Sequence, residues 1–328
     1  MRLEDICTVF TDGDWIESKD QSDEGIRLVQ TGNIGKGIYL EKEARAKYIS
    51  EDTFEKLKCT EIFPGDILVS RLPEPVGRAC IIPDKEERMI TAVDCTICRP
   101  DETVISKEYL CYFMRSNAYY TRLLGSVTGT TRKRISRKNL GNVELDVPSR
   151  EKQNEVVEQL DHLVNVIDSK TRELQLLDDL IQARFVEMFG DPVQNTKGWN
   201  IDTCKNLTSK IGSGATPKGG RESYGTEGIS LIRSMNVYNN RFEYKDLAYI
   251  TDEQADKLSN VTIEENDVLL NITGASVARC CAVPKELIPA RVNQHVAIVR
   301  CKDRLLPEFL CSMFTEDSYQ RLLWSIAT

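Results

Sequence analysis

The chain has 328 residues, 41% of them hydrophobic and 29% charged, and this length predicts two domains, each with its own core. No apolar run approaches the roughly 20 residues of a transmembrane helix, and the N-terminal residues lack a signal-peptide pattern, so we expect no membrane association. The 11 cysteines lack the spacing of a disulfide framework, which favours reduced thiols in a cytoplasmic protein. Taken alone, the net charge of -8 argues against nucleic acid as a partner.

Residues 1–148 predict a first domain of mixed short strands and helices. The apolar run at 66–70 is typical of a strand, and residues 52–57 and 108–115 predict helices. The charge then changes sign, because the stretch 125–141 contains cations and no acidic residue. These cations are Arg132, Lys133, Arg134, Arg137 and Lys138.

Residues 149–190 predict one long helix. Ser149 can cap its start, and Gly190 followed by Asp191 and Pro192 is a strong stop signal. A helix of about 40 residues is ~60 Å long, more than a small domain can bury, so we expect a coiled-coil partner. An ordinary amphipathic helix within a helical domain is the alternative. Apolar residues recur at alternating steps of four and three, at Val156, Leu160, Leu163, Ile167, Leu174, Leu177, Ile181 and Met188.

Residues 191–328 repeat the first domain with a period near 200 residues. The matches fall in one order, including 25–29 with 228–232, 48–49 with 249–250, 78–80 with 279–281, 108–111 with 308–311 and 120–124 with 319–323. We therefore predict an α+β protein of two homologous domains, 1–148 and 191–328, joined by the long helix. Cys80 and Cys281, like Cys111 and Cys311, hold equivalent positions, as small buried hydrophobes would.

Catalytic motifs are missing from the sequence. It has no P-loop, no Rossmann glycine pattern and no nucleophile elbow. Cys95 and Cys98 form a lone CxxC in a strand-like run, where alternation would point the two sulfurs to opposite faces. The triplets at 17–19 and 243–245 imitate part of a nuclease motif, but neither has a counterpart in the other copy. We expect neither a catalytic residue nor a metal site.

Two glycine-rich, basic segments are candidate contacts for a phosphate-bearing ligand, residues 125–139 and 211–221. Glycine permits close backbone approach, hydroxyls and cations bind phosphate oxygens, and arginine can read guanine. Solvated surface loops are the alternative, and Arg78 and Arg279 are either structural ion-pair partners or DNA contacts. The candidate residues are Thr130, Thr131, Arg132, Lys133, Arg134, Arg137, Lys138, Arg71, Arg78, Thr216, Lys218, Arg221, Arg233 and Arg279.

This layout resembles the specificity subunit of type I restriction-modification enzymes. Similar strings include GNI at 32–34, GTTR at 129–132, VP at 147–148 ahead of EKQ at 151–153, and IGSGATP at 211–217. The resemblance implies a non-catalytic subunit that reads a two-part target in double-stranded DNA, with the helix as spacer. It also implies methyltransferase and motor-nuclease restriction subunits as partners. We expect no cofactor on this chain, and S-adenosylmethionine, ATP and Mg in those partners.

Members of this family usually carry a second conserved helix after the second recognition domain, whereas this sequence stops at residue 328. We therefore expect a truncated specificity subunit whose long helix self-associates or pairs with a helix of another subunit. A scaffold or decoy that binds methyltransferase subunits without reading DNA is the alternative function.

Overall fold

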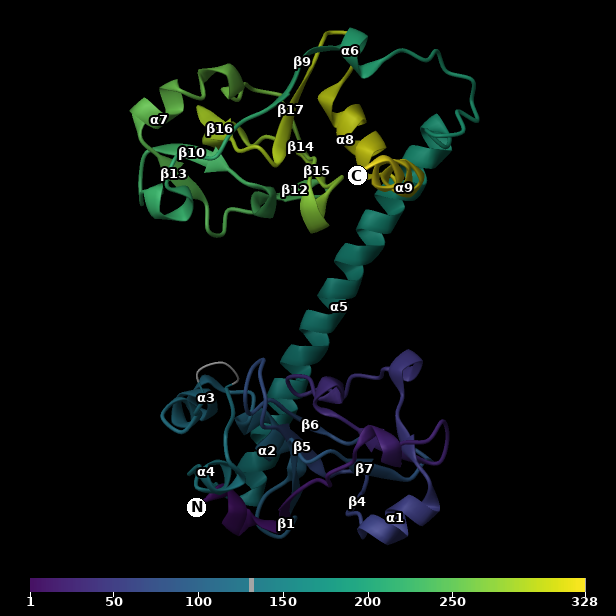
Figure 1. The fold of residues 1–328 in the computed structure, drawn as a ribbon, viewed down its shortest axis with the longest axis vertical. Helices are drawn as coiled ribbons and strands as arrows, with labels where there is room; N and C mark the ends of the chain where they lie inside the picture. Colours follow the sequence, from purple (N-terminus) through teal and green to yellow (C-terminus); the bar gives the residue numbers. More distant parts are fainter. Residues whose placement is uncertain (130–132, 328) are drawn as a thin grey trace. The chain divides into compact units, whose positions relative to one another are not determined.

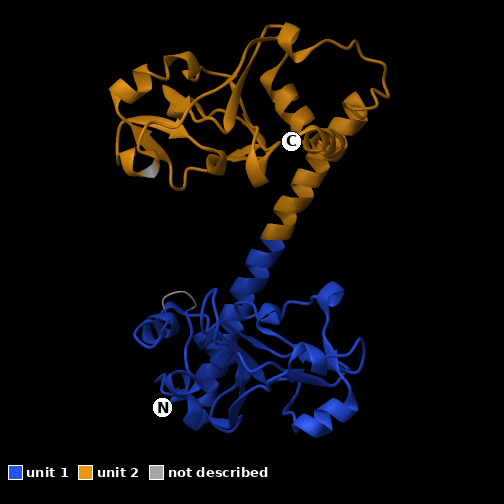
Figure 2. Ribbon diagram, viewed as in Figure 1, with its two compact units in different colours: residues 1–170 blue, residues 171–328 orange. Residues whose placement is uncertain are grey.

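The computed structural model describes residues 1–129 and 133–327. It divides into two compact units, Met1–Lys170 and Thr171–Thr328, which Figure 2 shows in different colours. No described helix is both long and apolar enough to cross a membrane.

Unit 1 contains two four-stranded sheets (Figure 1). The first has the order β1 (Cys7–Asp12), β8 (Cys95–Pro100), β5 (Ile67–Ser70) and β6 (Ala79–Ile81), with all pairs antiparallel. The second has the order β3 (Tyr48–Ile49), β2 (Ile26–Val29), β7 (Met89–Thr91) and β4 (Glu61–Ile62), in which β2 and β7 are parallel. The helices are α1 (Glu51–Leu57), α2 (Lys107–Phe113), α3 (Asn117–Leu124) and α4 (Arg137–Gly141).

The central strand β5 separates two cores because successive side chains point to opposite faces of a strand. Ile67 and Val69 belong to the core formed with α2, α3 and α4, whereas Leu68 belongs to the core shared with the second sheet. On β8, Cys98 lies in the first core and Cys95 in the second. The two sulfurs of the CxxC therefore lie on opposite faces, as the alternation predicted.

Unit 2 repeats this plan. Its larger sheet has the order β15 (Cys280–Ala282), β14 (Val268–Asn271), β17 (Val296–Cys301) and β9 (Thr208–Ser213). A second sheet pairs β13 (Ala248–Ile250), β10 (Ile229–Ile232) and β16 (Ala290–Val292), and a small hairpin pairs β11 (Val237–Tyr238) with β12 (Arg241–Phe242). The helices are α6 (Cys204–Leu207), α7 (Asp252–Asp256), α8 (Pro307–Thr315) and α9 (Asp317–Ile326).

The strand register confirms that the two units are copies of one fold. Leu68 of β5 pairs with Ile97, and the corresponding Leu269 of β14 pairs with Ile298. β2 and β7 are parallel, as are β10 and β16. One difference is that a single bridge between Thr262 and Arg291 occupies the place of β4 in unit 2.

A matched pair of glycines marks the start of β2 and β10. Gly25 has a φ of +119° and Gly228 a φ of +126°, conformations that L side chains rarely adopt. A Cβ at Gly25 would lie 2.5 Å from the carbonyl oxygen of Ile49, and one at Gly228 would lie 2.5 Å from that of Ile250. The same steric demand therefore explains why glycine stands at both repeat positions.

The long helix predicted between the copies is present as α5 (Arg150–Phe189). Lys152 donates its backbone N–H to the Ser149 hydroxyl at 3.4 Å, and the helix ends just before Gly190, whose φ is +79°. In unit 1, Gln153 of α5 is fully buried, and in unit 2, Phe185 packs against Phe309 of α8. Of the predicted apolar seam, Val156 and Leu160 are half-buried, and the six exposed members are Leu163, Ile167, Leu174, Leu177, Ile181 and Met188.

Candidate functional site

Arg71 stands directly after β5, at the end of the strand that separates the two cores of unit 1. Its Nη2 donates to the carbonyl oxygen of Val93 at 2.5 Å, and its Nε lies 3.4 Å from Oδ1 of Asp12. Burial lowers the pKa of Arg71, because the charged guanidinium has lost most of its solvent. Asp12 also accepts a 2.9 Å hydrogen bond from the hydroxyl of Thr96, so the carboxylate is fixed.

The basic segment of unit 1 is tied to Arg71 through its backbone. Thr128 and Arg134 exchange backbone hydrogen bonds of 2.9 and 2.8 Å, and Ile135 donates to the carbonyl of Arg71 at 3.2 Å. Ile135 is fully buried and anchors the segment in the core. The predicted contacts Thr130, Thr131 and Arg132 lie outside the described residues.

Two arginines of this segment face carboxylates beside Arg71. Nη2 of Arg134 lies 3.0 Å from Oδ1 of Asp94, and Nη1 of Arg137 lies 3.9 Å from Oδ2 of Asp12. Both arginine side chains are 47% exposed, so their remaining N–H groups are open to a ligand. We call Asp12, Arg71, Asp94, Arg134 and Arg137 the unit 1 cluster. The predicted contacts Lys133 and Lys138 are exposed, and neither forms an ion pair with another described residue.

Arg78 has the contacts of a structural residue. Its guanidinium donates to four backbone carbonyls, those of Ile34 and Thr31 at 2.7 Å, Leu72 at 2.8 Å and Pro75 at 3.2 Å. The residue is 9% exposed, and burial lowers its pKa. Between the two roles that the sequence left open for Arg78, these contacts favour the structural one, because few of its N–H groups are left for DNA.

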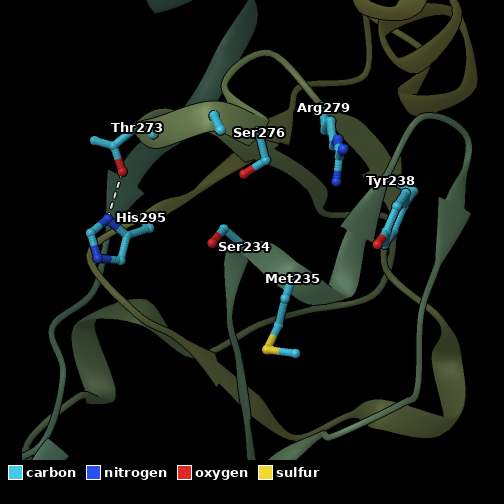
Figure 3. Close-up of a pocket in the computed structure, with 9 residues that line it drawn as sticks. Ser234, Met235, Tyr238, Thr273, Ser276, Arg279 and His295 are labelled. Atoms are coloured by element: carbon cyan, nitrogen blue, oxygen red, sulfur yellow. Dashed lines mark hydrogen bonds between the residues drawn. The ribbon is translucent and has the colours of Figure 1, made fainter. Parts of the chain in front are cut away.

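In unit 2 the corresponding region contains an open pocket of about 490 Å³ (Figure 3). The loop that follows β14 forms one part of its wall, and the turn that follows β10 forms another. The lining contains no carboxylate, although the chain as a whole is acidic. The lining residues are Ser234, Met235, Tyr238, Thr273, Gly274, Ala275, Ser276, Arg279 and His295.

A row of polar side chains connects the second glycine-rich segment to this pocket. The hydroxyl of Thr216 lies 2.5 Å from Oε1 of Gln294, and Nε2 of Gln294 lies 3.0 Å from Nε2 of His295. Nδ1 of His295 is in turn 2.5 Å from the hydroxyl of Thr273, the contact drawn in Figure 3. Thr216, predicted from sequence, is thereby placed beside the pocket.

The other predicted DNA contacts of unit 2 do not all lie at the pocket. Arg279 lines the pocket, and its guanidinium carbon lies 4.5 Å from the centroid of the Tyr238 ring. Arg233 turns away, since it donates to the carbonyl of Asp246 and lies over the Tyr224 ring. Lys218 is exposed on the 211–221 segment, and the side chain of Arg221 is outside the described set.

The two sites occupy corresponding loops and differ in chemistry. Arg71 follows β5 in unit 1, where Ile272 follows β14 in unit 2. Asp94 precedes β8, where His295 precedes β17. The sequence reasoning missed Asp12, Asp94 and His295. Their signal lay in the repeat itself, because these polar residues lie at the ends of matched strands and differ between the copies.

Among the described residues, no group of three or more histidine, cysteine or acidic side chains could hold a metal ion. The cysteines are free, and those at matched positions are buried.

A family model described as the type I restriction modification DNA specificity domain matches residues 1–178, more than half of the chain. The chain belongs to this specificity family.

Known members and structures agree with this assignment. The chain is 23% identical over 292 residues to a putative type I restriction enzyme MjaX specificity subunit of Methanocaldococcus jannaschii, covering 81% of this chain and 67% of that one. It is 22% identical over 163 residues to the HindI specificity subunit of Haemophilus influenzae, covering 47% and 36%. A chain from a solved type I R-M system covers 100% of this chain and 80% of its own length, with a TM-score of 0.53 and 16% identity.

The match to the HindI subunit thus spans about a third of that protein's length. The structural match shows a shared fold of mixed sheets and helices that includes a long helix. The unit 1 cluster and the pocket of unit 2 are formed by corresponding loops that carry different polar groups.

Proposed function

We propose that this chain is a non-catalytic DNA-specificity subunit of a type I restriction-modification system, in which each unit reads one half of a two-part target. The observation that carries the proposal is the contrast between the sites. Two copies of one scaffold keep their strand register while Arg71 and Asp94 of unit 1 are replaced by Ile272 and His295 in unit 2. Equivalent loops with different donors and acceptors suit a protein that reads two unlike half-sites.

The unit 1 cluster has the chemistry of guanine recognition. Arginine reads guanine with two parallel N–H donors, and this geometry requires that the guanidinium be held still. Asp94 can hold Arg134 by one edge at 3.0 Å while the other N–H groups remain accessible. Arg71, fixed by Asp12 and the carbonyl of Val93, adds positive potential underneath. We infer that Arg134 reads a base and that Lys133 and Lys138 contact phosphates.

The partners follow from the family and from α5. Leu163, Leu174 and Leu177 of this helix are 54%, 64% and 49% exposed, and apolar surface of this extent supports docking to another protein. Methyltransferase and restriction subunits are the partners we propose. S-adenosylmethionine, ATP and Mg would be bound by those partners and not by this chain.

The exposed apolar residues of α5 also support the alternative function, a scaffold or decoy that binds methyltransferase subunits without reading DNA. The two functions differ in one property. A specificity subunit selects particular duplexes from a random pool, whereas a scaffold retains its partner and selects none.

The test is selection of bound duplexes from a random pool, with the full chain alone and with methyltransferase subunit. We expect a two-part consensus from the wild type. Arg134→Lys keeps the charge but loses the paired donors, so we expect it to relax the preference at one base pair by roughly 1–3 kcal/mol. The second half of the consensus should not change.

Arg45→Lys is the matched control, since Arg45 is an exposed arginine of unit 1 outside the cluster. It should leave the consensus intact. An unselected pool, together with retained methyltransferase subunit, would exclude DNA recognition and favour the scaffold.

A further inference from the structure

The two units satisfy the same pair of backbone carbonyls with different side chains. In unit 1, Arg78 donates to the carbonyls of Thr31 and Ile34, both at 2.7 Å. The corresponding carbonyls of unit 2 are those of Ser234 and Val237, in the turn after β10. Here Nδ2 of Asn271 is the donor, at 2.9 Å to the Ser234 carbonyl, while its second N–H is shared between the Ser276 hydroxyl at 3.1 Å and the Val237 carbonyl at 3.5 Å.

Asn271 can take over this task because of its place at the end of β14. It corresponds to Ser70 of unit 1: Gly77 donates to the Ser70 carbonyl and Ala278 to the Asn271 carbonyl, both at 2.8 Å. A serine hydroxyl is short and has one donor, whereas the asparagine carboxamide reaches further and has two. The replacement of serine by asparagine therefore removes the need for an arginine at these carbonyls.

The consequence is an arginine, Arg279, whose N–H groups bond no other described residue. Arg279 corresponds to Arg78, since their carbonyls accept from Asn271 and Ser70 respectively, both at 2.8 Å. Within residues 1–129 and 133–327, the guanidinium of Arg279 makes no hydrogen bond and no ion pair, and it lies against the Tyr238 ring. The side chain is half-buried and lines the pocket, so its donors are held toward that space (Figure 3).

The rest of the pocket suits an anion. Its lining offers the hydroxyls of Ser234 and Ser276 and the imidazole of His295, and no carboxylate. Ser276 accepts a 3.1 Å hydrogen bond from Asn271, which leaves its own hydroxyl proton for a ligand. Arg241 lies over the same Tyr238 ring at 5.0 Å, and its own charge is met by Glu243, whose Oε2 is 3.9 Å from Nη2 of Arg241.

We propose that this pocket of unit 2 binds the phosphate group of a nucleotide, with Arg279 as its principal partner and Ser276 as a second donor. A charged guanidinium that is partly removed from water gains most from an oxyanion. The volume of about 490 Å³ leaves room for the attached nucleoside beside Met235 and Tyr238. The phosphate belongs either to the DNA backbone or to a free nucleotide. The first of these sources rests on the proposed function.

The experiment compares three variants of the full chain. Arg279→Gln removes the charge. Asn271→Ser restores the side chain of unit 1 and should draw Arg279 onto the carbonyls of Ser234 and Val237. Arg279 then keeps its charge but no longer binds a ligand in the pocket. Arg304→Gln is the control, because Arg304 is an exposed arginine of unit 2 outside the pocket. Circular dichroism checks that each variant is folded.

Two probes distinguish the sources of phosphate. The first is a random duplex pool, titrated at several salt concentrations. For Arg279→Gln and Asn271→Ser we expect about tenfold weaker binding across all sequences, with a salt slope lower by about one. The second probe is adenosine monophosphate, titrated by calorimetry, whose binding should be lost in the same two variants if the pocket accepts a free nucleotide. Arg304→Gln should match the wild type with both probes.

The outcomes separate this inference from the proposed function. If the wild type binds duplex selectively and both pocket variants match it with both probes, the pocket inference is wrong and the function stands. If the wild type binds no duplex but binds the nucleotide through Arg279, the function fails and the pocket stands. If Asn271→Ser binds as the wild type while Arg279→Gln does not, the release of Arg279 by Asn271 is refuted.

Discussion

Arginine side chains stand at matched positions of the two units, and some of the matched pairs make the same contacts while others do not. One pair is shared, since Arg99 binds Asp66 through two hydrogen bonds of 2.7 and 2.8 Å, and Arg300 binds Asp267 with the same distances. Both carboxylates are buried, and the two parallel hydrogen bonds offset the cost of removing them from water. This matched pair of arginines therefore keeps one role in both units, whereas Arg78 and Arg279 make different contacts.

Arg78 and Arg279 give opposite expectations for stability. Arg78→Ala leaves four carbonyls without their donor, three of them at 2.8 Å or less, so we expect unit 1 to lose about 3 kcal/mol. Arg279→Ala removes no internal hydrogen bond and should change the stability of unit 2 by less than about 1 kcal/mol. Differential scanning calorimetry of both variants measures this. Equal losses would contradict the structural role assigned to Arg78.

The matched cysteines behave as small hydrophobic residues, as the repeat predicted. Cys80 and Cys281 are 0% and 1% exposed, and burial raises the pKa of each to about 12. A thiol with so high a pKa carries almost no thiolate at neutral pH, and the thiolate is the reactive form. Packing in the core is therefore sufficient to explain why cysteine stands at these two matched positions.

At the scale of elements, a buried side chain, Gln153, helps to fix the start of α5 to unit 1. Gln153 is 0% exposed and donates to the carbonyls of Val104 at 3.0 Å and Pro148 at 2.9 Å. It also accepts from the backbone N–H of Ser106 at 2.8 Å, and the Ser106 hydroxyl caps α2. One carboxamide therefore joins the starts of α2 and α5.

Replacing this carboxamide should weaken unit 1 at the root of the helix. Gln153→Ala leaves one buried and two partly buried backbone groups without this partner, and we expect a loss of about 2–4 kcal/mol in the free energy of unfolding. Urea titration followed by circular dichroism measures it. Gln159→Ala is the control on the same helix, because Gln159 is exposed and bonds only Glu155. If both variants lost the same small amount, Gln153 would not be an anchor.

At the scale of the whole molecule, the middle of α5 presents exposed apolar side chains. Leu163, Leu174 and Leu177 are 54%, 64% and 49% exposed, and their spacing follows the heptad of a coiled coil. A second copy of this helix can bury such a seam, because two helices interlock their apolar residues at these steps.

We therefore expect the isolated chain to self-associate. Changing Leu163, Leu174 and Leu177 together to serine should return it to a monomer in sedimentation velocity at tens of micromolar. A control with serine at the polar positions Gln159, Asp168 and Gln175 should associate as the wild type does. A wild-type chain that sediments as a monomer at these concentrations would contradict the expectation.

The sequence by itself determined the plan of the molecule. The repeat, the strands at 66–70 and their counterparts and the long helix were legible because periodicity and capping are local properties of the chain. The basic segment 125–141 was equally visible. Its relation to Asp12 and Asp94 was not, because those carboxylates come from distant strands that only the sheet brings together.

Only the tertiary structure decided the roles of the repeated arginines. In the sequence, Arg78 and Arg279 are indistinguishable members of one alignment. The fold shows that the guanidinium of Arg78 donates its hydrogen bonds to backbone carbonyls. In unit 2, Asn271 donates to two of the corresponding carbonyls, and Arg279 faces a pocket. The physical reason is that hydrogen-bond satisfaction is a property of a three-dimensional neighbourhood. A change of one residue at the end of β14 can therefore alter the function of another eight positions along the chain.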